Sequence, residues 1–268
     1  MAIKKDGTQR YICKECGRRF TALTNTIFDS KKIPISEWIE YLLHLFEFHS
    51  INSTAYDNRN SPTTGKYWLI KTFEVLKGIQ DDIVLDGTVY LDETYFTKVR
   101  SKLVTKDGKK LRGISRNKIG VGVACNETTS IFIVTGTSKP SRKSTKETYS
   151  QHIARGSVLV HDDEHSHSIL IEELELESIV YPTKETKGSS DKDNPLYPVN
   201  NLHLLLKQFI RNHGAYDREH LQDWLNLFWF IMNEPKDKYD KVLKFIEMAV
   251  LSPKKVRYRD AMSSKHCK

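Results

Sequence analysis

The sequence is poor in cysteine and contains no long apolar run, internal repeat or low-complexity tract. Its 268 residues include four cysteines, Cys13, Cys16, Cys125 and Cys267, too few and too scattered for a disulfide framework. No stretch approaches the roughly 18 consecutive apolar residues of a membrane span. The first residues also lack the apolar core of a signal peptide. We therefore expect a cytoplasmic protein with reduced thiols and no membrane partner.

Acidic residues are outnumbered by basic ones. The chain has 42 lysines and arginines against 34 aspartates and glutamates, a formal net charge of +8. The rest of the composition is ordinary for a globular protein, with 38% hydrophobic residues. The charge balance favours a polyanionic partner, nucleic acid first, although a basic soluble protein without such a partner would have the same composition.

The amino-terminal segment holds half of a zinc-ribbon motif. Residues 11–20 place Cys13 and Cys16 around a turn that ends at Gly17. A structural zinc site needs four ligands, and no second Cys-x-x-Cys precedes Cys13, so this possible zinc site is incomplete. A redox pair is the alternative, but the motif lacks the strand-to-helix setting of thioredoxin-like proteins.

Helical spacing dominates the next segment, residues 30–82. Apolar residues recur with a helical period from Ile35 onward, and two short helical stretches then flank the turn 60–62. This pattern predicts a helix-turn-helix, whose second helix enters the major groove of DNA. An ordinary helical hairpin would give the same pattern. The residues at the leading end of the second helix, where base and phosphate contacts are made, are Thr63, Thr64, Lys66 and Tyr67.

Strands and helices alternate after Gly78. We predict strands at 84–96, 119–125, 130–136, 157–161 and 178–181, and helices at 145–154, 167–176, 199–212, 218–232 and 239–251. Three strands followed by alternating helix and strand is the order of an RNase H-like mixed α/β sheet flanked by helices. The segment 183–194 is expected to be a mobile loop and 254–268 a loose basic tail. The predicted units are 1–29, a partial zinc ribbon; 30–82, the helix-turn-helix domain; 83–235, the RNase H-like domain; and 236–268, a terminal helix and tail.

Two aspartates stand where the predicted strands would otherwise be apolar. Asp92 lies inside the run 88–96, and Asp162 directly follows the strand 157–161. A carboxylate within a sheet is costly unless it is paired or binds a metal. Two such acids on neighbouring strands could bracket a pair of divalent ions roughly 3.5 to 4 Å apart, which supports in-line attack at phosphorus. Alone, each could instead be a helix N-cap or a turn residue.

The helix predicted at 199–212 has polar residues at helical spacing. Asn200, His203 and Lys207 fall on one side, and Leu202, Leu205, Leu206 and Phe209 fall on the other. If the polar side faces the two aspartates, His203 can ligate metal or relay a proton, and Lys207 can hold a phosphate. A stripe that faces solvent is the alternative.

A basic segment connects the first two predicted strands, with Asp107 as its single acid. We interpret it as a phosphate track, whose binding to DNA should weaken steeply with salt. A solvated charged loop is the alternative. The basic residues are Lys98, Arg100, Lys102, Lys106, Lys109, Lys110, Arg112, Arg116 and Lys118.

Histidines near Asp162 allow a different interpretation. Together with carboxylates, His161, His165 and His167 could ligate a catalytic zinc, as in a zinc hydrolase. Their spacing matches no mechanistic zinc motif, and the basic segment favours a DNA partner.

The combination of these motifs resembles DDE-type insertion-sequence transposases of the ISXO-like family over nearly the whole chain. Members run zinc ribbon, helix-turn-helix, then RNase H-like core. The segments that carry the resemblance are 11–20, 90–95, 112–118, 161–162 with 166–167, 200–207 and 220–225.

The resemblance implies that Asp92 and Asp162 are the first two catalytic acids and that the third position falls on His203. The family's first Cys-x-x-Cys is absent, so the sequence looks truncated at its amino end. Related enzymes often carry glutamate or asparagine where this chain has His203. Imidazole suits manganese or zinc better than magnesium, so His203 either tunes the metal preference or only positions a phosphate.

The sequence thus predicts a transposase that cuts and joins double-stranded DNA, at the ends of an insertion sequence and at its target, with Mg²⁺ or Mn²⁺. Lys207 would anchor a phosphate beside the metal ligands. The family implies a homo-oligomer, associated with the nucleoid. A DNA-binding protein without activity, derived from a decayed element, is the main alternative.

Overall fold

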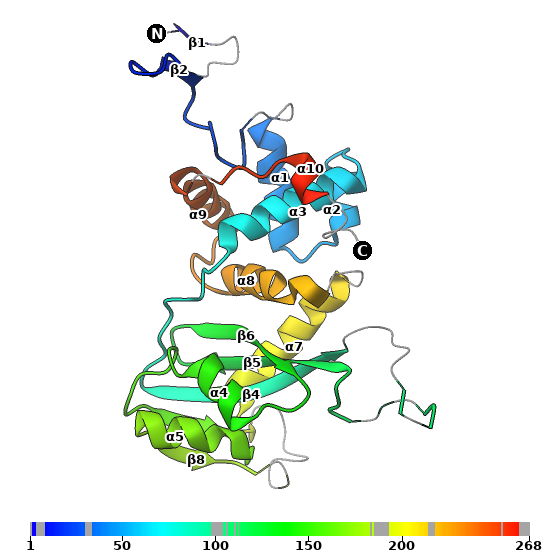
Figure 1. Ribbon diagram of the computed structural model, residues 1–268, viewed down its shortest axis with the longest axis vertical. Coiled ribbons are helices and arrows are strands. Elements are labelled where there is room, and N and C mark those ends of the chain that lie inside the picture. Colours follow the sequence, from blue (N-terminus) through cyan, green and yellow to red (C-terminus); the bar gives the residue numbers. More distant parts are fainter. Residues whose placement is uncertain are drawn as a thin grey trace. The chain divides into compact units, whose positions relative to one another are not determined.

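The computed structural model forms two compact units (Figure 1). The first unit comprises residues 1–77 and 234–268, and the second comprises 78–233. The structure describes residues 2–3, 9–29, 34–97, 104–105, 107–109, 111, 113–182, 184, 193–213, 218–252 and 254–262. Most of the predicted loop 183–194 lies outside these ranges. No helix among the described residues is both long enough and apolar enough to cross a membrane.

The second unit is built on a five-stranded sheet with the order β6-β5-β4-β7-β8. β4 pairs antiparallel with β5, and β5 pairs antiparallel with β6, whereas β4, β7 and β8 run parallel. This order and direction confirm the predicted RNase H-like mixed sheet. The strands are β4 (Thr88–Thr97), β5 (Lys118–Cys125), β6 (Ser130–Thr137), β7 (Val158–His161) and β8 (Glu177–Val180).

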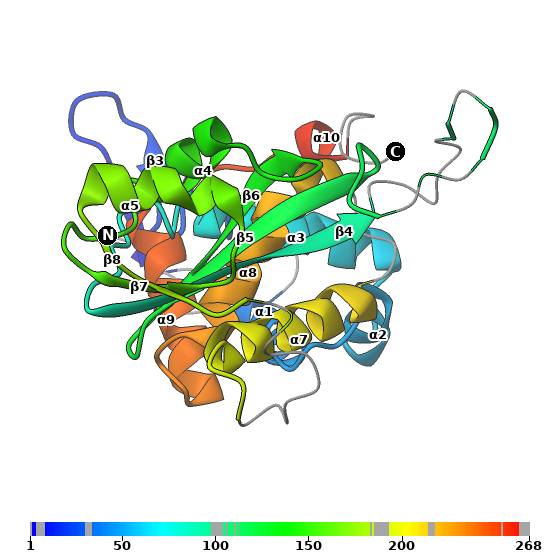
Figure 2. The same ribbon diagram turned by 90° about the horizontal axis from the view of Figure 1, so that it is seen from below.

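Helices cover both faces of this sheet (Figure 2). On one face, α4 (Arg142–Tyr149) and α5 (Ser168–Leu174) close a core that includes Leu91, Leu159 and Leu170. On the other face, α7 (Tyr197–Asn212) contacts β4 and β5, and α8 (Leu221–Met232) contacts β6. The parallel connections therefore pass through helices, as parallel strands require.

Local sequence signals set several helix starts. The helix predicted at 145–154 begins earlier, at Arg142, because Ser141 and Ser144 form a reciprocal capping box. Pro198 stands in the first turn of α7, where its missing N–H costs nothing. The short 3-10 helices η1 (His165–His167) and η3 (Arg218–His220) lead into α5 and α8.

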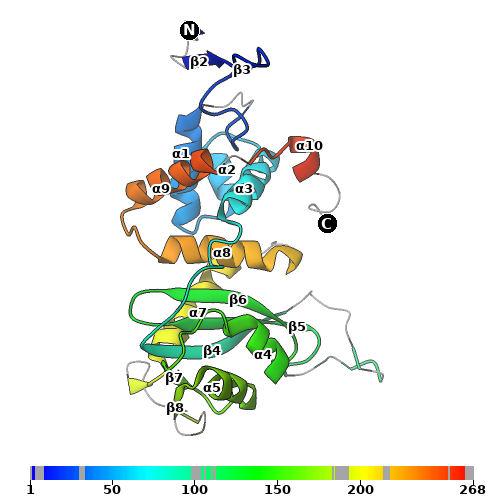
Figure 3. The same ribbon diagram turned by 60° about the vertical axis from the view of Figure 1, so that its left-hand side comes forward.

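The first unit is mostly helical (Figure 3). Its helices pack around an aromatic centre. Trp38 stacks on Trp68 with ring centroids 4.4 Å apart, and the Tyr41 hydroxyl donates to the Gly65 carbonyl oxygen at 3.0 Å. The helices are α1 (Ile35–Phe46), α2 (Ile51–Asp57), α3 (Pro62–Leu76), α9 (Lys238–Leu251) and α10 (Tyr258–Ala261).

The sequence predicts that residues 236–268 form a separate terminal helix and tail. In the structure, α9 contacts α1 and α3, and α10 contacts α3. The Tyr67 hydroxyl of α3 donates to the Val256 carbonyl oxygen at 2.7 Å. Part of the segment expected to be a loose tail is therefore packed on the helical unit.

The amino-terminal strands are short. β1 (Ala2–Ile3), β2 (Gln9–Ile12) and β3 (Arg19–Phe20) form a three-stranded antiparallel sheet. The turn between β2 and β3 contains Cys13 and Cys16 and closes at Gly17, whose φ of 67° favours glycine.

Candidate active site

Asp92 and Asp162 meet at neighbouring strands. The parallel register of β4 and β7 pairs Leu91 with His161, so that each aspartate directly follows a member of the last pair. β4 continues past this point to Thr97, whereas β7 ends at His161. About a quarter of each aspartate side chain is exposed, 25% for Asp92 and 26% for Asp162. The two acids predicted from the sequence therefore share one partly open site.

The electrostatics of this site disfavour two ionised carboxylates. Burial, followed by the negative charges of Glu93 and Asp162, raises the pKa of Asp92 to about 7. Burial also raises the pKa of Asp162, although the Glu164 N–H donates to its Oδ1 at 3.0 Å. The site has more negative charge than its own hydrogen bonds neutralise, a condition that a bound cation relieves.

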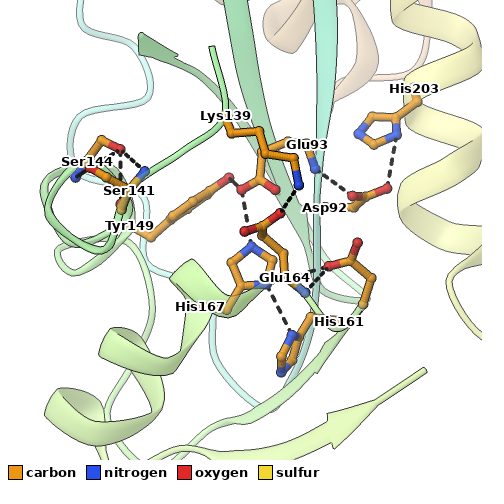
Figure 4. A network of polar contacts seen from close by, with 11 residues as sticks. Asp92, Glu93, Lys139, Ser141, Ser144, Tyr149, His161, Glu164, His167 and His203 are labelled. Carbon is orange, nitrogen blue, oxygen red and sulfur yellow. Dashed lines mark hydrogen bonds and ion pairs between the residues drawn. The ribbon is translucent and has the colours of Figure 1, made fainter. Parts of the chain in front are cut away.

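His203 lies beside Asp92, on the side of α7 that faces the sheet. Its Nδ1 is 3.7 Å from Asp92 Oδ2 (Figure 4). The buried side of α7 contains His203 together with Val199, Leu206 and Ile210, because these positions follow one another at helical spacing. The predicted separation of a polar stripe from an apolar one is therefore wrong for His203, which belongs to the stripe facing the sheet.

The protonation of His203 is set by its surroundings. Burial, and then the positive charge of Lys207, lower the pKa of His203 to about 4. The ring is therefore neutral at physiological pH, which is the form that ligates metal. Among the described residues, none offers a hydrogen-bond partner to its buried Nε2. Lys207 itself is exposed one turn further along α7.

The opposite face of β4 holds a hydrogen-bonded network that sequence reasoning missed (Figure 4). Glu93 points to this face because side chains alternate along a strand, and its side chain is only 4% exposed. The Tyr149 hydroxyl lies 3.1 Å and His167 Nε2 lies 3.2 Å from Glu93 Oε1. His167 Nδ1 lies 3.1 Å from His161 Nδ1, and His161 Nε2 lies 3.1 Å from Ser178 Oγ.

The pKa values of His167 and His161 shift in opposite directions, which determines which ring nitrogen donates in each hydrogen bond. Burial alone would lower the pKa of His167, but the hydrogen bond and charge of Glu93 outweigh it and raise the value. Burial and the charge of His167 lower the pKa of His161 to about 4. A charged His167 therefore donates to both Glu93 and neutral His161, and His161 donates to Ser178.

A glycine makes room for this network. Gly122 of β5 pairs with Glu93, and a Cβ at that position would lie 2.0 Å from Tyr149 Oη. Only a residue without a side chain leaves space for the tyrosine ring over the strand. The presence of glycine inside an apolar strand was the available sequence signal for a close approach.

Histidines 161 and 167 can form a ligand group with Asp162, since one ligand atom from each lies within 4.8 Å of the others. His165, the third histidine of the hydrolase alternative, is exposed in η1. His161 and His167 are hydrogen-bonded to each other, His167 also to Glu93 and His161 also to Ser178, so their ring nitrogen atoms are already engaged. Asp92 and His203 have no such mutual hydrogen bond.

Other predicted residues are placed as follows. Thr63 and Lys66 are exposed in the first turns of α3, and Thr64 is half-buried, its hydroxyl 3.0 Å from the Ser61 hydroxyl. Lys109 and Arg116 are exposed. Several predicted basic residues lie outside the described ranges: Lys98, Arg100, Lys102, Lys106, Lys110 and Arg112.

The Cys13 and Cys16 thiols lie together in the turn after β2. Backbone N–H groups of Cys16 and Glu15 lower the pKa of Cys13, which favours the thiolate that a metal requires. Within the described part of the chain, no group of three or more candidate metal ligands includes either cysteine.

The donor types at Asp92, Asp162 and His203 suit a divalent metal, but these three described residues do not bring one ligand atom each within 4.8 Å of the others. Two carboxylates and one neutral imidazole are the oxygen and nitrogen ligands that manganese, zinc and, less readily, magnesium accept. The buried Nε2 of His203 lacks a hydrogen-bond partner among the described residues, and the carboxylates repel each other. Both features are costs in the absence of a cation.

Comparisons with known proteins give structural likeness only. No family model and no curated protein matches the sequence. The chain is similar to a solved structure of a pre-cleavage Mos1 transpososome, with 14% identity, a TM-score of 0.33, and coverage of 85% of this chain and 80% of that one. It is similar to a mariner Mos1 paired-end complex with Mg, at 15% identity and a TM-score of 0.35, covering 86% of this chain and 84% of that one.

A further solved structure shows a similar degree of likeness. The chain covers 70% of its own length and 67% of a chain in a simian T-cell lymphotropic virus intasome, at 9% identity and a TM-score of 0.33. Likeness of this degree does not assign an activity, so the activity of this chain is argued from its own residues.

Proposed function

We propose that this chain is a DDE-type transposase that cuts and joins DNA strands with a divalent metal. The observation that carries the proposal is the position of Asp92 within β4 beside the end of β7, which Asp162 directly follows, with the neutral ring of His203 beside Asp92. These three side chains would hold the metal. When bound, a divalent cation supplies Lewis-acid charge for phosphoryl transfer.

The chain's own residues have separate roles in this proposal. The Glu93 N–H donates to Asp92 Oδ1 at 2.7 Å and so fixes the orientation of that carboxylate. Lys207, exposed one turn beyond His203, would hold a phosphate of the bound strand. The pair Lys139 and Glu164, 3.3 Å apart, keeps the carboxylate of Glu164 engaged, so we do not assign Glu164 as a ligand.

DNA binding is proposed for two surfaces. Thr63 and Lys66 are exposed at the start of α3, the position from which a recognition helix contacts DNA. Lys109 and Arg116 are exposed in the basic segment between β4 and β5. We expect Lys66→Ala to weaken binding and to reduce its salt dependence by the contribution of about one phosphate.

A cleavage assay with three variants tests the proposal. Duplex DNA from both flanks of the coding sequence would be incubated with the full chain and Mn²⁺ or Mg²⁺. We expect Asp92→Ala and Asp162→Ala each to lose strand cleavage about a thousandfold or more, which corresponds to about 4 kcal/mol of barrier. The matched control is Asp163→Ala, since Asp163 is exposed and directly follows Asp162.

The outcomes separate the two candidate functions. Cleavage by the parent and by Asp163→Ala, with none by the other two variants, supports the transposase. Salt-sensitive binding without cleavage by the parent supports the alternative, a non-catalytic DNA-binding protein from a decayed element. Equal cleavage by all four proteins would remove Asp92 and Asp162 from the chemistry.

A further inference from the structure

A second group of metal-ligating side chains lies in the first unit. His44 belongs to the last turn of α1, His49 to the connection that follows, and Asp57 is the last residue of α2. The Nδ1 atoms of His44 and His49 lie 3.6 and 3.8 Å from the same atom, Asp57 Oδ2. One ligand atom from each residue lies within 4.8 Å of the other two. Three parts of the chain thus converge on one point.

The backbone brings the two histidines together. Phe48 adopts a left-handed conformation with φ of 66°, the Phe48 N–H donates to Leu45 O at 3.2 Å, and the His49 N–H donates to His44 O at 3.1 Å. These two bonds are those of a Schellman motif, which ends α1 and turns the chain back on itself. The imidazole rings consequently stack, with centroids 5.1 Å apart and planes 24° apart. Both rings present Nδ1 to the same carboxylate.

Asp57 is held in place from its own helix. The Ser53 hydroxyl donates to Asp57 Oδ2 at 3.4 Å, and Ser50 caps the start of the same helix. The Ser53 hydroxyl thus orients the Asp57 carboxylate, and the Ser50 cap fixes the start of the same helix. The group needs no rearrangement of the backbone to present its three donors.

The distances distinguish this group from an ordinary histidine–aspartate pair. Elsewhere in the chain, His220 Nδ1 lies 3.0 Å from Asp223 Oδ2, a normal hydrogen bond. Both contacts to Asp57 are too long for hydrogen bonds, and among the described residues His44 Nδ1 has no hydrogen-bond partner although it is buried. Ligands about 2.0–2.2 Å from a tetrahedral ion lie roughly 3.3–3.6 Å apart. The observed separations are close to that range.

We propose that His44, His49 and Asp57 bind a divalent transition-metal cation of the zinc class. Two imidazoles and one carboxylate are a ligand set that zinc accepts, with a fourth position left to solvent. His49 is 41% and Asp57 37% exposed, so the group is accessible to ions from solution. The cation ties the end of α1 to the end of α2. These two helices directly precede α3, which carries the DNA-binding residues proposed above.

Metal counting with matched variants tests this site. The full chain, first stripped with EDTA, is dialysed against zinc chloride, and bound zinc is measured for the parent, His49→Gln, Asp57→Asn and the control His220→Gln. Because Cys13, Cys16 and the acidic site can also take up zinc, the informative quantity is the difference between proteins. We expect the parent and the control to hold one zinc per chain more than His49→Gln or Asp57→Asn.

Thermal unfolding gives an independent result on the same proteins. Circular dichroism in EDTA should show equal helix content in all four, since the altered side chains are partly exposed. At free zinc 100 times its Kd, a site present only in the folded state lowers the unfolding equilibrium constant about 100-fold. We expect this 100-fold stabilisation by zinc to be absent from His49→Gln and Asp57→Asn. Equal zinc content, or equal stabilisation by zinc in all four proteins, would overturn the proposal, whatever the cleavage assay shows.

Discussion

The two faces of β4 carry neighbouring acids in opposite conditions. Glu93 is enclosed, and Tyr149 and His167 both donate to its Oε1. Asp92, one residue earlier, is partly exposed, its pKa is raised to about 7, and the nearest ring nitrogen of His203 stays 3.7 Å away. Glu93 therefore receives hydrogen bonds from the protein itself. Asp92 Oδ2 can instead accept an external ligand such as a cation.

The hydrogen bonding of a buried carboxylate distinguishes a structural residue, such as Glu93, from a residue of the candidate active site, such as Asp92. Removing one partner of a buried, hydrogen-bonded charge destabilises the fold, because the other group is left unpaired. A partly buried charge crowded by other negative charges destabilises it. Carboxylates whose pKa is strongly raised in this way are found mainly at functional sites. The criterion predicts opposite signs for neutralising Asp92 and Glu93.

Neutralising Asp92 should produce the largest effect and the clearest sign. We expect Asp92→Asn to reduce strand cleavage at least a thousandfold while it stabilises the folded protein in EDTA at pH 8 by about 1–3 kcal/mol. Because the folded pKa of Asp92 is raised from 3.8 to about 7, the ionised side chain costs stability that grows between those pH values. The difference should vanish near pH 4, where the parent is protonated too.

Denaturant unfolding at pH 4 and pH 8 measures this gain, with the cleavage assay run on the same preparation. A protein that loses both activity and stability at pH 8 would show that Asp92 is a structural residue. The exposed neighbour Asp163 again supplies the control, and Asp163→Asn should change neither quantity by more than about 0.5 kcal/mol.

Neutralising Glu93 should have the opposite sign. We expect Glu93→Gln to destabilise the protein by about 2–4 kcal/mol at pH 6, because the buried His167 loses its charged partner. The pKa of His167 is raised in the parent, so its contribution is present below the ordinary value of 6.5 and is lost as pH rises through the folded value. The destabilisation should therefore be smaller at pH 9.

Two measurements check this second expectation. Unfolding by denaturant at pH 6 and pH 9 gives the pH dependence, and NMR titration of the His167 ring should show a lower pKa in the variant. Equal destabilisation at both pH values would mean that Glu93 acts through packing and not through its charge.

Much of this comparison follows from the sequence. Period-2 alternation places Asp92 away from Leu91 and the core, and the strand-helix-strand order puts the ends of two parallel strands side by side. These two regularities predicted that Asp92 and Asp162 would meet. They are local or topological, so they do not depend on how individual side chains pack.

The partners of Glu93 depend on packing and could not be predicted in that way. Tyr149 is 56 residues and His167 is 74 residues away along the chain, and each reaches Glu93 from a different element. Helical periodicity gives the face of a helix but not the strand residue that it covers. For His203, the apolar residues Val199 and Leu206 at helical spacing from it are the sequence signal that this side of the helix is buried.

The enclosed face can also be disturbed without touching a charge. We expect Gly122→Ala to destabilise the protein by about 1–3 kcal/mol, because the added Cβ would lie 2.0 Å from Tyr149 Oη. Adding Tyr149→Phe removes that nearest atom, so the double variant should lose less than the sum of the single variants. A double-mutant cycle from denaturant unfolding measures this coupling. Strict additivity would show that the strand, not the tyrosine, responds to the methyl group.

The far end of the enclosed network should give the smallest effect. Ser178 of β8 is exposed, and its hydroxyl accepts from His161 Nε2 at 3.1 Å. We expect Ser178→Ala to cost about 0.5–1.5 kcal/mol, because water can take over part of the lost hydrogen bond, and to leave cleavage unchanged. The neighbouring exposed residue Glu177 provides the control, and Glu177→Ala should fall within about 0.5 kcal/mol of the parent. A loss of cleavage in Ser178→Ala would mean that the two faces of β4 are coupled through His161 and Asp162, and the separation of scaffold from site would then fail.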